Sequence, residues 1–345
     1  MPRPVTNVLE YRLAVAKMAI FPSPARPRHS AGERHAFQHV DHLLRKIGCP
    51  QTRPQSGWHR DFTGENVRKF QFEGSAAAIT GAASGIGRAL AFELAARGCD
   101  VALADLDEAG LESAAKEIIA TYARRATISR IDVADPNQIQ DFALSAVADF
   151  PSLNILINNA GVALLGQFDE FDQAQMAWLM DINFWGVVRG TRAFMSHLQS
   201  RPQAHIVNIS SIFGIIAPPG QSAYCASKFA VRGFSEALRH ELAMNNSTLR
   251  LSVVHPGGVK TNIARKARAG AHLRESVSSN ELAERFEQLA RTTPAAAAQR
   301  IVRGIERNEP RILIGRDAQF LDIIQRFRPA TYWALLARAF KRMAV

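Results

Sequence analysis

The chain has 345 residues, of which 47% are hydrophobic, and a formal net charge of +11. This composition is typical of a globular protein with one large domain or two ordinary ones. It contains no run of about 18 apolar residues, which argues against a transmembrane helix. Its three cysteines, Cys49, Cys99 and Cys225, lie too far apart for a metal-ligand motif or a disulfide framework, so we expect a reducing, cytoplasmic location and no metal.

The positive charge is concentrated at the two ends of the chain. Residues 1–70 carry 12 Lys/Arg against 5 Asp/Glu, residues 260–345 carry 17 against 8, and residues 71–259 carry 13 against 18. The basic ends favour an anionic surface as their partner. They do not indicate nucleic-acid binding, because the chain has no motif for it and its N-terminal end lacks interleaved aromatic residues.

Residues 1–70 are predicted to form a poorly ordered N-terminal extension. Pro22, Pro24 and Pro27, together with a charged stretch rich in histidine, interrupt any sustained hydrophobic periodicity. Two interpretations remain open at this point: the segment is a genuine appendage, or it is upstream sequence translated from the wrong start.

From Ser75 onwards, short apolar strands alternate with amphipathic helices. This alternation predicts a doubly wound α/β fold, in which helices cover both faces of a parallel sheet through right-handed crossovers. We assign residues 71–261 to this core, 262–319 to a following segment that ends with a helix and a last strand, and 320–345 to a basic amphipathic tail. The expected strands are Ala76–Ile79, Val101–Ala104, Thr127–Ile131, Leu153–Ile157, Ala204–Ile209, Leu249–Val254 and Arg311–Ile314. The expected helices are Arg88–Arg97, Glu108–Ala123, Pro136–Asp149, Tyr224–Met244 and Pro294–Asn308, with long helices also expected within Gln173–Gln199.

A glycine turn follows the first strand of this core. Gly81, Gly85 and Gly87 lie between a strand and a helix, where glycine allows a tight turn and lets backbone amides approach a pyrophosphate. Their spacing is G-x-x-x-G-x-G rather than the usual G-x-G-x-x-G, so the signal depends on its strand–turn–helix context. This context predicts a dinucleotide site.

Asp105, at the end of the second strand, bears on which dinucleotide is bound. A carboxylate at this position accepts hydrogen bonds from the ribose hydroxyls of adenosine and repels a 2′-phosphate. Ser84 and Leu106 stand where an enzyme specific for NADP would carry Arg or Lys. We therefore expect NAD, with NADP as the less favoured cofactor; the alternative role of Asp105 is to cap the next helix.

Tyr224 and Lys228 are four residues apart in an expected helix, so their side chains share one face. A free tyrosine has a pKa of about 10, and a nearby lysine cation lowers it by favouring the phenolate. Ser211, which follows the preceding strand, is placed to hold a substrate oxygen beside the phenol. These groups suit proton transfer to or from an alcohol or a carbonyl. A Tyr-x-x-x-Lys pair alone is more often a half-buried tyrosine with a solvated lysine. The choice between this structural role and a catalytic one therefore depends on the other motifs of the chain.

Taken together and in this order, these motifs resemble the short-chain dehydrogenase/reductase family. The resemblance extends over roughly residues 74–261, and its motifs are weak singly but specific as a set. They are Thr80-Gly81-Ala82-Ala83-Ser84-Gly85-Ile86-Gly87, Asp132-Val133, Asn158-Asn159-Ala160-Gly161, Asn183, Ser211, Tyr224-Cys225-Ala226-Ser227-Lys228 and Pro256-Gly257-Gly258-Val259-Lys260-Thr261.

The resemblance implies a Rossmann-like, NAD(P)-dependent oxidoreductase that interconverts a secondary alcohol and a ketone. It makes Tyr224 the general acid/base, and Lys228 the residue that lowers the pKa of Tyr224 and holds the nicotinamide ribose. Ser211 would orient the substrate oxygen, and Asn183 would anchor a water that relays protons to Lys228. The implied cofactor contacts are Gly81, Ser84, Gly85, Ile86 and Gly87 in the glycine turn, Asp105 at the ribose, Asp132 and Val133 at the adenine, Asn159 along the cofactor, and Pro256, Gly257, Val259 and Thr261 around the carboxamide.

We expect a hydrophobic alcohol or ketone as substrate, because the side chains predicted to lie near the site are apolar. They are Leu164, Ile212, Phe213, Ala217 and Pro218, for which ordinary core packing is the alternative. In this family the segment after the Pro-Gly turn often forms a mobile lid, which here would be residues 262 to about 293.

The remaining expectations concern partners. The tail at 320–345 interleaves apolar and basic residues, a pattern of helices that pack on their own domain or a sister subunit, or that lie on an anionic membrane. The resemblance implies a homodimer or homotetramer formed through the helices near residues 174–197 and 224–244. A non-catalytic dinucleotide-binding sensor or scaffold is the alternative function, and the complete set of Asn183, Ser211, Tyr224 and Lys228 favours the enzyme.

Overall fold

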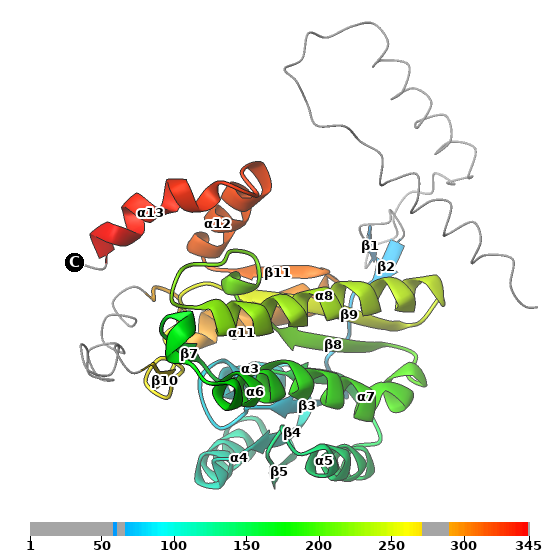
Figure 1. The fold of residues 1–345 in the computed structure, drawn as a ribbon. Helices are drawn as coiled ribbons and strands as arrows, with labels where there is room; N and C mark the ends of the chain where they lie inside the picture. Colours follow the sequence, from blue (N-terminus) through cyan, green and yellow to red (C-terminus); the bar gives the residue numbers. More distant parts are fainter. Residues whose placement is uncertain (1–57, 61–65, 271–289, 344–345) are drawn as a thin grey trace, which may run out of the picture. The chain divides into compact units, whose positions relative to one another are not determined.

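The structure is a computed structural model that describes residues 58–60, 66–270 and 290–343 (Figure 1). The chain divides into two units after Pro54, and all described residues belong to the second unit. Most of the expected N-terminal extension, and residues 271–289 of the expected lid, lie outside the described residues. The described end of the extension forms β1 (Trp58–Arg60) and β2 (Asn66–Arg68), which pair antiparallel.

A seven-stranded parallel sheet forms the centre of the core (Figure 1). Its order is β11-β9-β8-β6-β3-β4-β5, and every neighbouring pair is parallel. The chain starts at β3, winds to one edge through β4 and β5, and then crosses back to β6 to wind towards the other edge. This topology confirms the predicted doubly wound α/β fold. The strands are β3 (Ala76–Thr80), β4 (Asp100–Asp105), β5 (Ala126–Arg130), β6 (Leu153–Asn158), β8 (Ala204–Ile209), β9 (Leu249–Pro256) and β11 (Arg311–Ile314).

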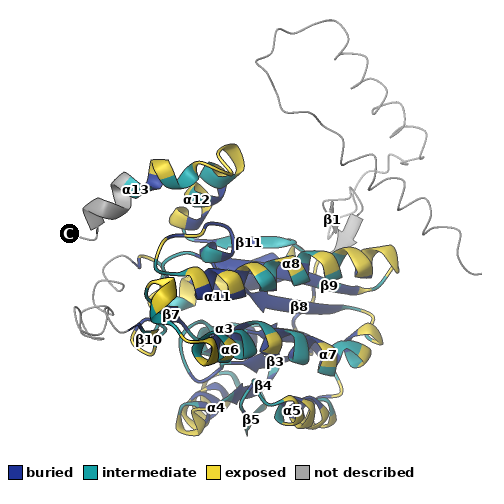
Figure 2. Cartoon of the chain, in the orientation of Figure 1, coloured by how far each residue is buried: buried dark blue, intermediate teal, exposed yellow. Residues whose placement is uncertain are grey.

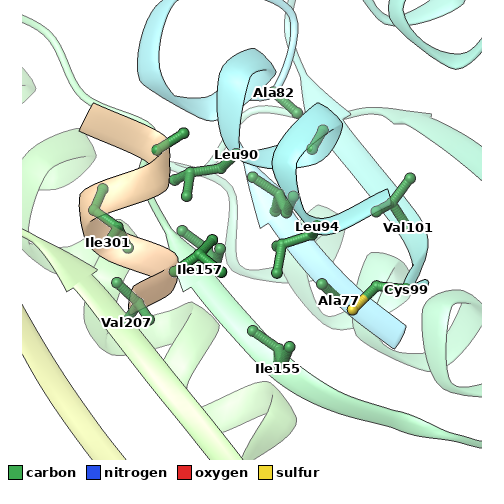
Figure 3. Packing of buried hydrophobic residues seen from close by; sticks show 14 of the residues in the cluster. Ala77, Ala82, Leu90, Leu94, Cys99, Val101, Ile155, Ile157, Val207 and Ile301 are labelled. Carbon is green, nitrogen blue, oxygen red and sulfur yellow. The ribbon is translucent and has the colours of Figure 1, made fainter. Parts of the chain in front are cut away.

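Helices cover both faces of the sheet. One face packs against α3 (Gly85–Ala96), α4 (Glu108–Tyr122) and α11 (Pro294–Glu306), and the other against α5 (Pro136–Asp149), α7 (Gly186–Gln199) and α8 (Ser222–Met244). Figure 3 shows Leu90 and Leu94 of α3 and Ile301 of α11 with Ile157 and Val207 of the sheet. The central strands are buried, whereas the edge strand β5 is partly exposed and many exposed residues lie along the helices (Figure 2).

The apolar strands follow from burial on both faces. Side chains alternate between the two faces of a strand, so a sheet covered on both sides needs apolar residues at nearly every position. In β4, Val101 and Leu103 pack towards α3 and α4, whereas Ala102 and Ala104 pack towards α5. A short apolar run in this sequence therefore indicates a central strand.

Three local features differ from the expectations. The helices expected over Gln173–Gln199 are α6 (Gln173–Met180) and α7, and the unexpected feature is the π-helical turn η2 (Asp181–Trp185) between them. A short parallel pair joins β7 (Leu164–Leu165) to β10 (Arg268–Ala269), at the start of the expected lid. The tail forms α12 (Arg316–Phe327) and α13 (Tyr332–Met343), so its first helix begins at Arg316 instead of Phe320. Two short 3-10 turns, η1 (Phe168–Glu170) and η3 (Ile212–Gly214), complete the described elements.

Candidate active site

The predicted site residues gather at the carboxyl ends of the parallel strands. The strand order reverses between β3 and β6, which is the point where doubly wound sheets bind their ligands. Thr80 ends β3 and Asn158 ends β6, so the glycine turn and the Asn158–Gly161 segment start side by side at this point.

The glycine turn has the conformation that its glycines were expected to allow. Gly81 and Gly85 have φ values of +67° and +57°, a region that other residues rarely adopt. Helix α3 begins at Gly85, and its N-cap residue, Ser84, makes no side-chain capping hydrogen bond. The first amides of α3 therefore lack a side-chain cap, as a helix N-terminus that binds a pyrophosphate requires.

Asn159 fixes the shape of this turn. Its Nδ2 donates to the carbonyl oxygens of Thr80 and Gly81, at 3.0 and 2.9 Å. A Cβ on Gly87 would collide with the carbonyl oxygen of Gly81 and with Nδ2 of Asn159. The Asn159 side chain thus holds the turn through its backbone carbonyls. Position 87 has to be glycine, because any Cβ there would collide with the backbone of Gly81 and the side chain of Asn159.

Asp105 lies beside the turn, at the end of β4. Its Oδ2 accepts a hydrogen bond from the amide of Ala83 at 3.0 Å, and its Oδ1 accepts one from the amide of Asp107 at 3.1 Å. Asp107, rather than Asp105, caps α4 through the amide of Gly110. The helix-capping alternative for Asp105 is therefore not what the structure shows, and each of its carboxylate oxygens retains capacity for a ribose hydroxyl.

Asp132 and Val133 follow β5 at the same end of the sheet. The Asp132 carboxylate accepts from the amide of Ala134 at 2.9 Å and so forms a tight turn. The buried Val133 lies against Gly186 at the start of α7, where its side chain would be 3.1 Å from a Cβ. This segment therefore borders the site on the β5 side.

Ser211, Tyr224 and Lys228 are brought together as predicted, and all three are buried. Tyr224 and Lys228 lie one turn apart on α8, with Nζ of Lys228 5.7 Å from the centre of the phenol ring. The Tyr224 side chain is hydrogen-bonded to Ser211. Nζ of Lys228 donates to the carbonyl oxygen of Ile209 at 3.1 Å, which holds the lysine against the end of β8.

The pKa of Tyr224 differs from the expectation. Burial raises it to about 12, while the hydrogen bond with Ser211 acts in the opposite direction. Burial also lowers the pKa of Lys228 to about 8. The predicted net lowering of the tyrosine pKa is therefore wrong for this structure, because burial is the largest influence on the phenol and raises its pKa.

Asn183 is fully buried in the π-helical turn. Its Nδ2 donates to the carbonyl oxygen of Val162 and to Oγ of Ser227, at 3.0 and 3.1 Å, and its Oδ1 accepts from the amide of Val162 at 2.8 Å. A Cβ on Gly161 would lie 3.2 Å from this Oδ1 and 3.4 Å from Nζ of Lys228. Asn183 and Lys228 therefore face each other across Gly161.

The Pro256–Thr261 turn reaches the glycine turn from the other side. A Cβ on Gly85 would lie 3.2 Å from the methyl group of Thr261. The amide of Gly257 donates to the carbonyl oxygen of Ile314 at 2.9 Å, and the buried Val259 forms an isolated bridge with Thr292. The predicted carboxamide turn is thus attached to β11 and lies next to the predicted pyrophosphate turn.

Residues 75–272 match the family model described as short chain dehydrogenase. The chain belongs to the short-chain dehydrogenase/reductase family.

Named relatives agree with this assignment. "Putative oxidoreductase SadH" from Mycobacterium tuberculosis (strain ATCC 25618 / H37Rv) is 42% identical over 269 residues, which cover 77% of this chain and 95% of the relative. A short chain dehydrogenase/reductase from Burkholderia phymatum, solved in complex with NAD, is 31% identical with a TM-score of 0.68 and covers 75% of this chain and 95% of its own. An alcohol dehydrogenase from Thermococcus sibiricus, complexed with 5-hydroxy-NADP, shares the fold at 20% identity and a TM-score of 0.60, over 70% of this chain and 95% of its own. The chain is therefore an oxidoreductase of this family, which acts on CH–OH groups with NAD or NADP.

The five apolar residues expected near the substrate differ in how deeply they are buried. Leu164 and Ile212 are buried, whereas the half-buried Phe213 packs edge-on against Tyr224, with ring centres 6.3 Å apart. Pro218 is buried and Ala217 is exposed on the loop before α8. The apolar side chains that cluster with Tyr224 include Leu164, Leu179, Phe171, Met176, Trp178, Phe213 and Ile263.

Sequence reasoning missed three residues that support this dehydrogenase site. His255 holds the carbonyl oxygen of Ser211 through Nδ1 at 2.8 Å. Oδ2 of Asp317 accepts from the amide of Gly258 at 2.7 Å, and the hydroxyl of Tyr332 accepts from the amide of Ala217 at 2.8 Å. Each acts through a backbone group of a distant segment, and no local sequence signal marks such a contact.

Proposed function

We propose that this chain interconverts a secondary alcohol and a ketone with NAD, using Tyr224 as the general acid/base. The observation that carries the proposal is the hydrogen-bonded Ser211–Tyr224 pair with Lys228 one helical turn away, at the strand ends beside the glycine turn. The nicotinamide of the bound cofactor supplies the hydride chemistry. The chain's own groups have to orient the substrate oxygen and move one proton.

The raised pKa of Tyr224 favours the protonated phenol at neutral pH. In the reducing direction this phenol gives its proton to the substrate oxygen, and Ser211 holds that oxygen in place. In the oxidising direction the phenol has to lose its proton before it can accept one from the alcohol. The nearby ammonium of Lys228 favours that ionisation, and a cationic nicotinamide ring would act in the same sense.

A proton route beyond the phenol is supported by the surroundings of Gly161. Oδ1 of Asn183 accepts one hydrogen bond, from Val162, and has capacity for a second. It faces Nζ of Lys228 across a glycine whose missing side chain leaves space between the two groups. We propose that this space holds the water that links Lys228 to Asn183.

The proposed preference for NAD depends on Asp105. Its carboxylate ends β4 beside the glycine turn and would oppose a 2′-phosphate there by charge. Replacing Asp105 with Asn should reduce the preference, measured as the ratio of the dissociation constants for NADPH and NADH. A wild-type ratio near or below one would contradict the proposal.

The proposed substrate is hydrophobic, since a cluster of apolar side chains packs with Tyr224 next to the polar groups of Ser211 and Lys228. A panel of alcohols should show higher kcat/KM for bulky apolar members than for short polar ones. A clear preference for polar polyols would contradict this part. We further propose a cytoplasmic homodimer or homotetramer formed through α7 and α8, where Trp185, Phe229 and Met244 expose apolar surface next to or along these helices.

The central test is Tyr224→Phe, which removes the phenolic hydroxyl and retains the ring. Turnover of NAD with the alcohol panel should fall to background, while the protein fluorescence titration with NADH should give an unchanged dissociation constant. Tyr122→Phe, at the end of α4, is the matched control and should retain activity. Full activity in Tyr224→Phe would refute the mechanism. Absence of turnover in the wild type across the panel, with NADH still bound, would favour the sensor or scaffold.

A further inference from the structure

Helix α12 carries three exposed apolar side chains in one line, named here the α12 ridge: Phe320, Ile323 and Phe327. Their exposed fractions are 60%, 53% and 81%. Residues three and four positions apart share a helix face, so the three side chains form a continuous apolar strip. A contiguous apolar strip at the surface, unlike single scattered apolar residues, is a candidate interaction surface.

Helix α12 packs on the rest of the protein through the face opposite the ridge. Ala318, on the inner side of the helix, is fully buried in a cluster with Ile212, Ile215 and Ile216. Leu321 and Ile324 pack partly against the same cluster. The inner face therefore supplies the packing that α12 needs, and the ridge residues are among the exposed positions along α12 (Figure 2).

The carboxylates of α12 are engaged by the protein itself. Asp317 accepts the hydrogen bond from the amide of Gly258. Asp322 is buried and pairs with Arg311 at 3.3 Å and with Arg326 at 2.8 Å. The negative charge of the helix is therefore directed inwards.

The cations of the same region remain at the surface. Arg316 and Arg328 are exposed at the two ends of the ridge, and the side chain of Arg326 is 59% exposed. From Ile323 to Ala337, where the side chains are described, the chain contains Arg326 and Arg328 and no Asp or Glu. On α13, Leu335 adds a further exposed apolar side chain, at 56%. The surface around the ridge is therefore both apolar and cationic.

We propose that the α12 ridge docks this protein on an anionic lipid surface. The apolar side chains would enter the boundary between headgroups and acyl chains, and the arginines would bind the lipid phosphates. A second copy of the chain fits less well, because a symmetric contact through this ridge would place Arg316, Arg326 and Arg328 of one copy against those of the other. The proposal depends on this surface alone and holds or fails independently of the proposed reaction.

Docking would bring the site close to the lipid. Asp317 ties the first turn of α12 to Gly258, in the turn predicted to hold the nicotinamide carboxamide. A surface that binds α12 therefore lies near the carboxyl ends of the strands, where an apolar substrate would enter from the lipid.

The test is flotation of the full chain with vesicles of phosphatidylcholine alone or of phosphatidylcholine with phosphatidylglycerol at about three to one. The wild type should float with the anionic vesicles and much less with the neutral ones. Raising the salt concentration to about 0.5 M should reduce binding, because charge interactions are then screened within about 4 Å. Phe320→Ser combined with Ile323→Ser should lower the partition coefficient at least about tenfold, as expected for two apolar side chains that no longer leave water.

The chain offers a closely matched control. Leu144 on α5 and Ile119 on α4 are 62% and 52% exposed, nearly the same as Phe320 and Ile323. Leu144→Ser combined with Ile119→Ser should leave binding unchanged. For the charges, Arg316→Gln with Arg328→Gln should weaken binding to anionic vesicles, whereas Lys116→Gln with Arg303→Gln should not.

Three outcomes would overturn the proposal. The first is that the wild type stays with the unbound fraction at every lipid concentration up to about 1 mM, which would leave an acidic protein as the partner to seek. The second is an equal loss of binding in the ridge and control variants. The third is a molar mass by light scattering that falls in the ridge variant while vesicles are not bound, which would make the ridge a contact between copies.

Discussion

We predict that two buried histidines, His205 and His255, make the free energy of unfolding fall as the pH is lowered. Nε2 of His205 donates to Oγ of Ser252 at 2.8 Å, since that hydroxyl itself donates to the carbonyl oxygen of Glu309. Nδ1 of His255 donates to the carbonyl oxygen of Ser211. The other ring nitrogen of each has no hydrogen-bond partner among the described residues, so a second proton would create a buried donor without an acceptor.

The size of the effect follows from the pKa values. Burial lowers the pKa of His205 from 6.5 to about 3 and that of His255 from 6.5 to about 4. Since the folded state binds fewer protons than the unfolded state, the stability is fully present above about pH 6.5 and is lost as the pH falls towards the folded pKa values. Between about pH 7.5 and pH 5.5, each histidine should remove about 1.4 kcal/mol from the free energy of unfolding. This value hardly changes as long as the folded pKa stays below about 5.

Urea unfolding at these two pH values tests the prediction, with the protein concentration held constant in case the chain associates. His205→Asn and His255→Asn should each reduce the pH-dependent loss of unfolding free energy by about 1.4 kcal/mol, and the double variant by about 2.7 kcal/mol. His240→Asn, at an exposed position of α8, is the control and should show the same loss as the wild type. An identical loss in the wild type and the double variant would refute the reasoning from burial.

Three further predictions follow from contacts at the site. Gly161→Ala places a Cβ 3.2 Å from Oδ1 of Asn183 and 3.4 Å from Nζ of Lys228, and should lower kcat about tenfold or more while NADH binding persists; an unchanged kcat would contradict the proposed water position. Asp317→Ala removes the acceptor of the Gly258 amide and should raise the NADH dissociation constant about fivefold in a fluorescence titration, so an unaltered constant would show that this contact does not position the turn. Burial raises the pKa of Cys99 and Cys225 to about 12, so a thiol reagent at about pH 8 should label neither until the protein is unfolded. The chain's third cysteine, Cys49, is outside this prediction, so rapid labelling of more than one thiol per folded chain would count against it.

The core of the fold was predictable because local and global preferences agree. Helix α5 begins and ends at the predicted residues, Pro136 and Asp149: Asp135 caps its first amides and Pro136 occupies its first position. The last strand, Arg311–Ile314, was likewise predicted at both ends. The glycine turn could be assigned from its spacing and its strand–turn–helix context, and the positive φ values of Gly81 and Gly85 agree with that assignment.

The features that escaped prediction depend on contacts between distant segments. The π-helical turn has no signal of its own, because the bonds of Asn183 to Val162 and Ser227 only exist once α8 is in place. The spacing of Tyr224 and Lys228 indicated that they are neighbours, but not how deeply both are buried. Burial sets the direction of the pKa shifts of both residues, and the spacing of two residues in a sequence carries no information on how deeply they are buried.

The π-helical turn at Asp181–Trp185 makes the number of residues in the continuous helical stretch from α6 to α7 important for the site. A residue in a regular α-helix turns the chain by about 100°, and a π turn accommodates one residue more than the regular spiral would. Leu179 on one side of it meets the cluster around Tyr224, and Phe194 on the other side meets the sheet. Deleting a single residue here would leave a regular helix in which Leu179 and Phe194 could still face their partners, because the π turn absorbs the additional residue. The residues inside the turn would be redirected instead, and Asn183 would lose its hydrogen bonds to Val162 and Ser227. Homologues with a shorter helix at this point would therefore have to reach Asn183's position by a different path.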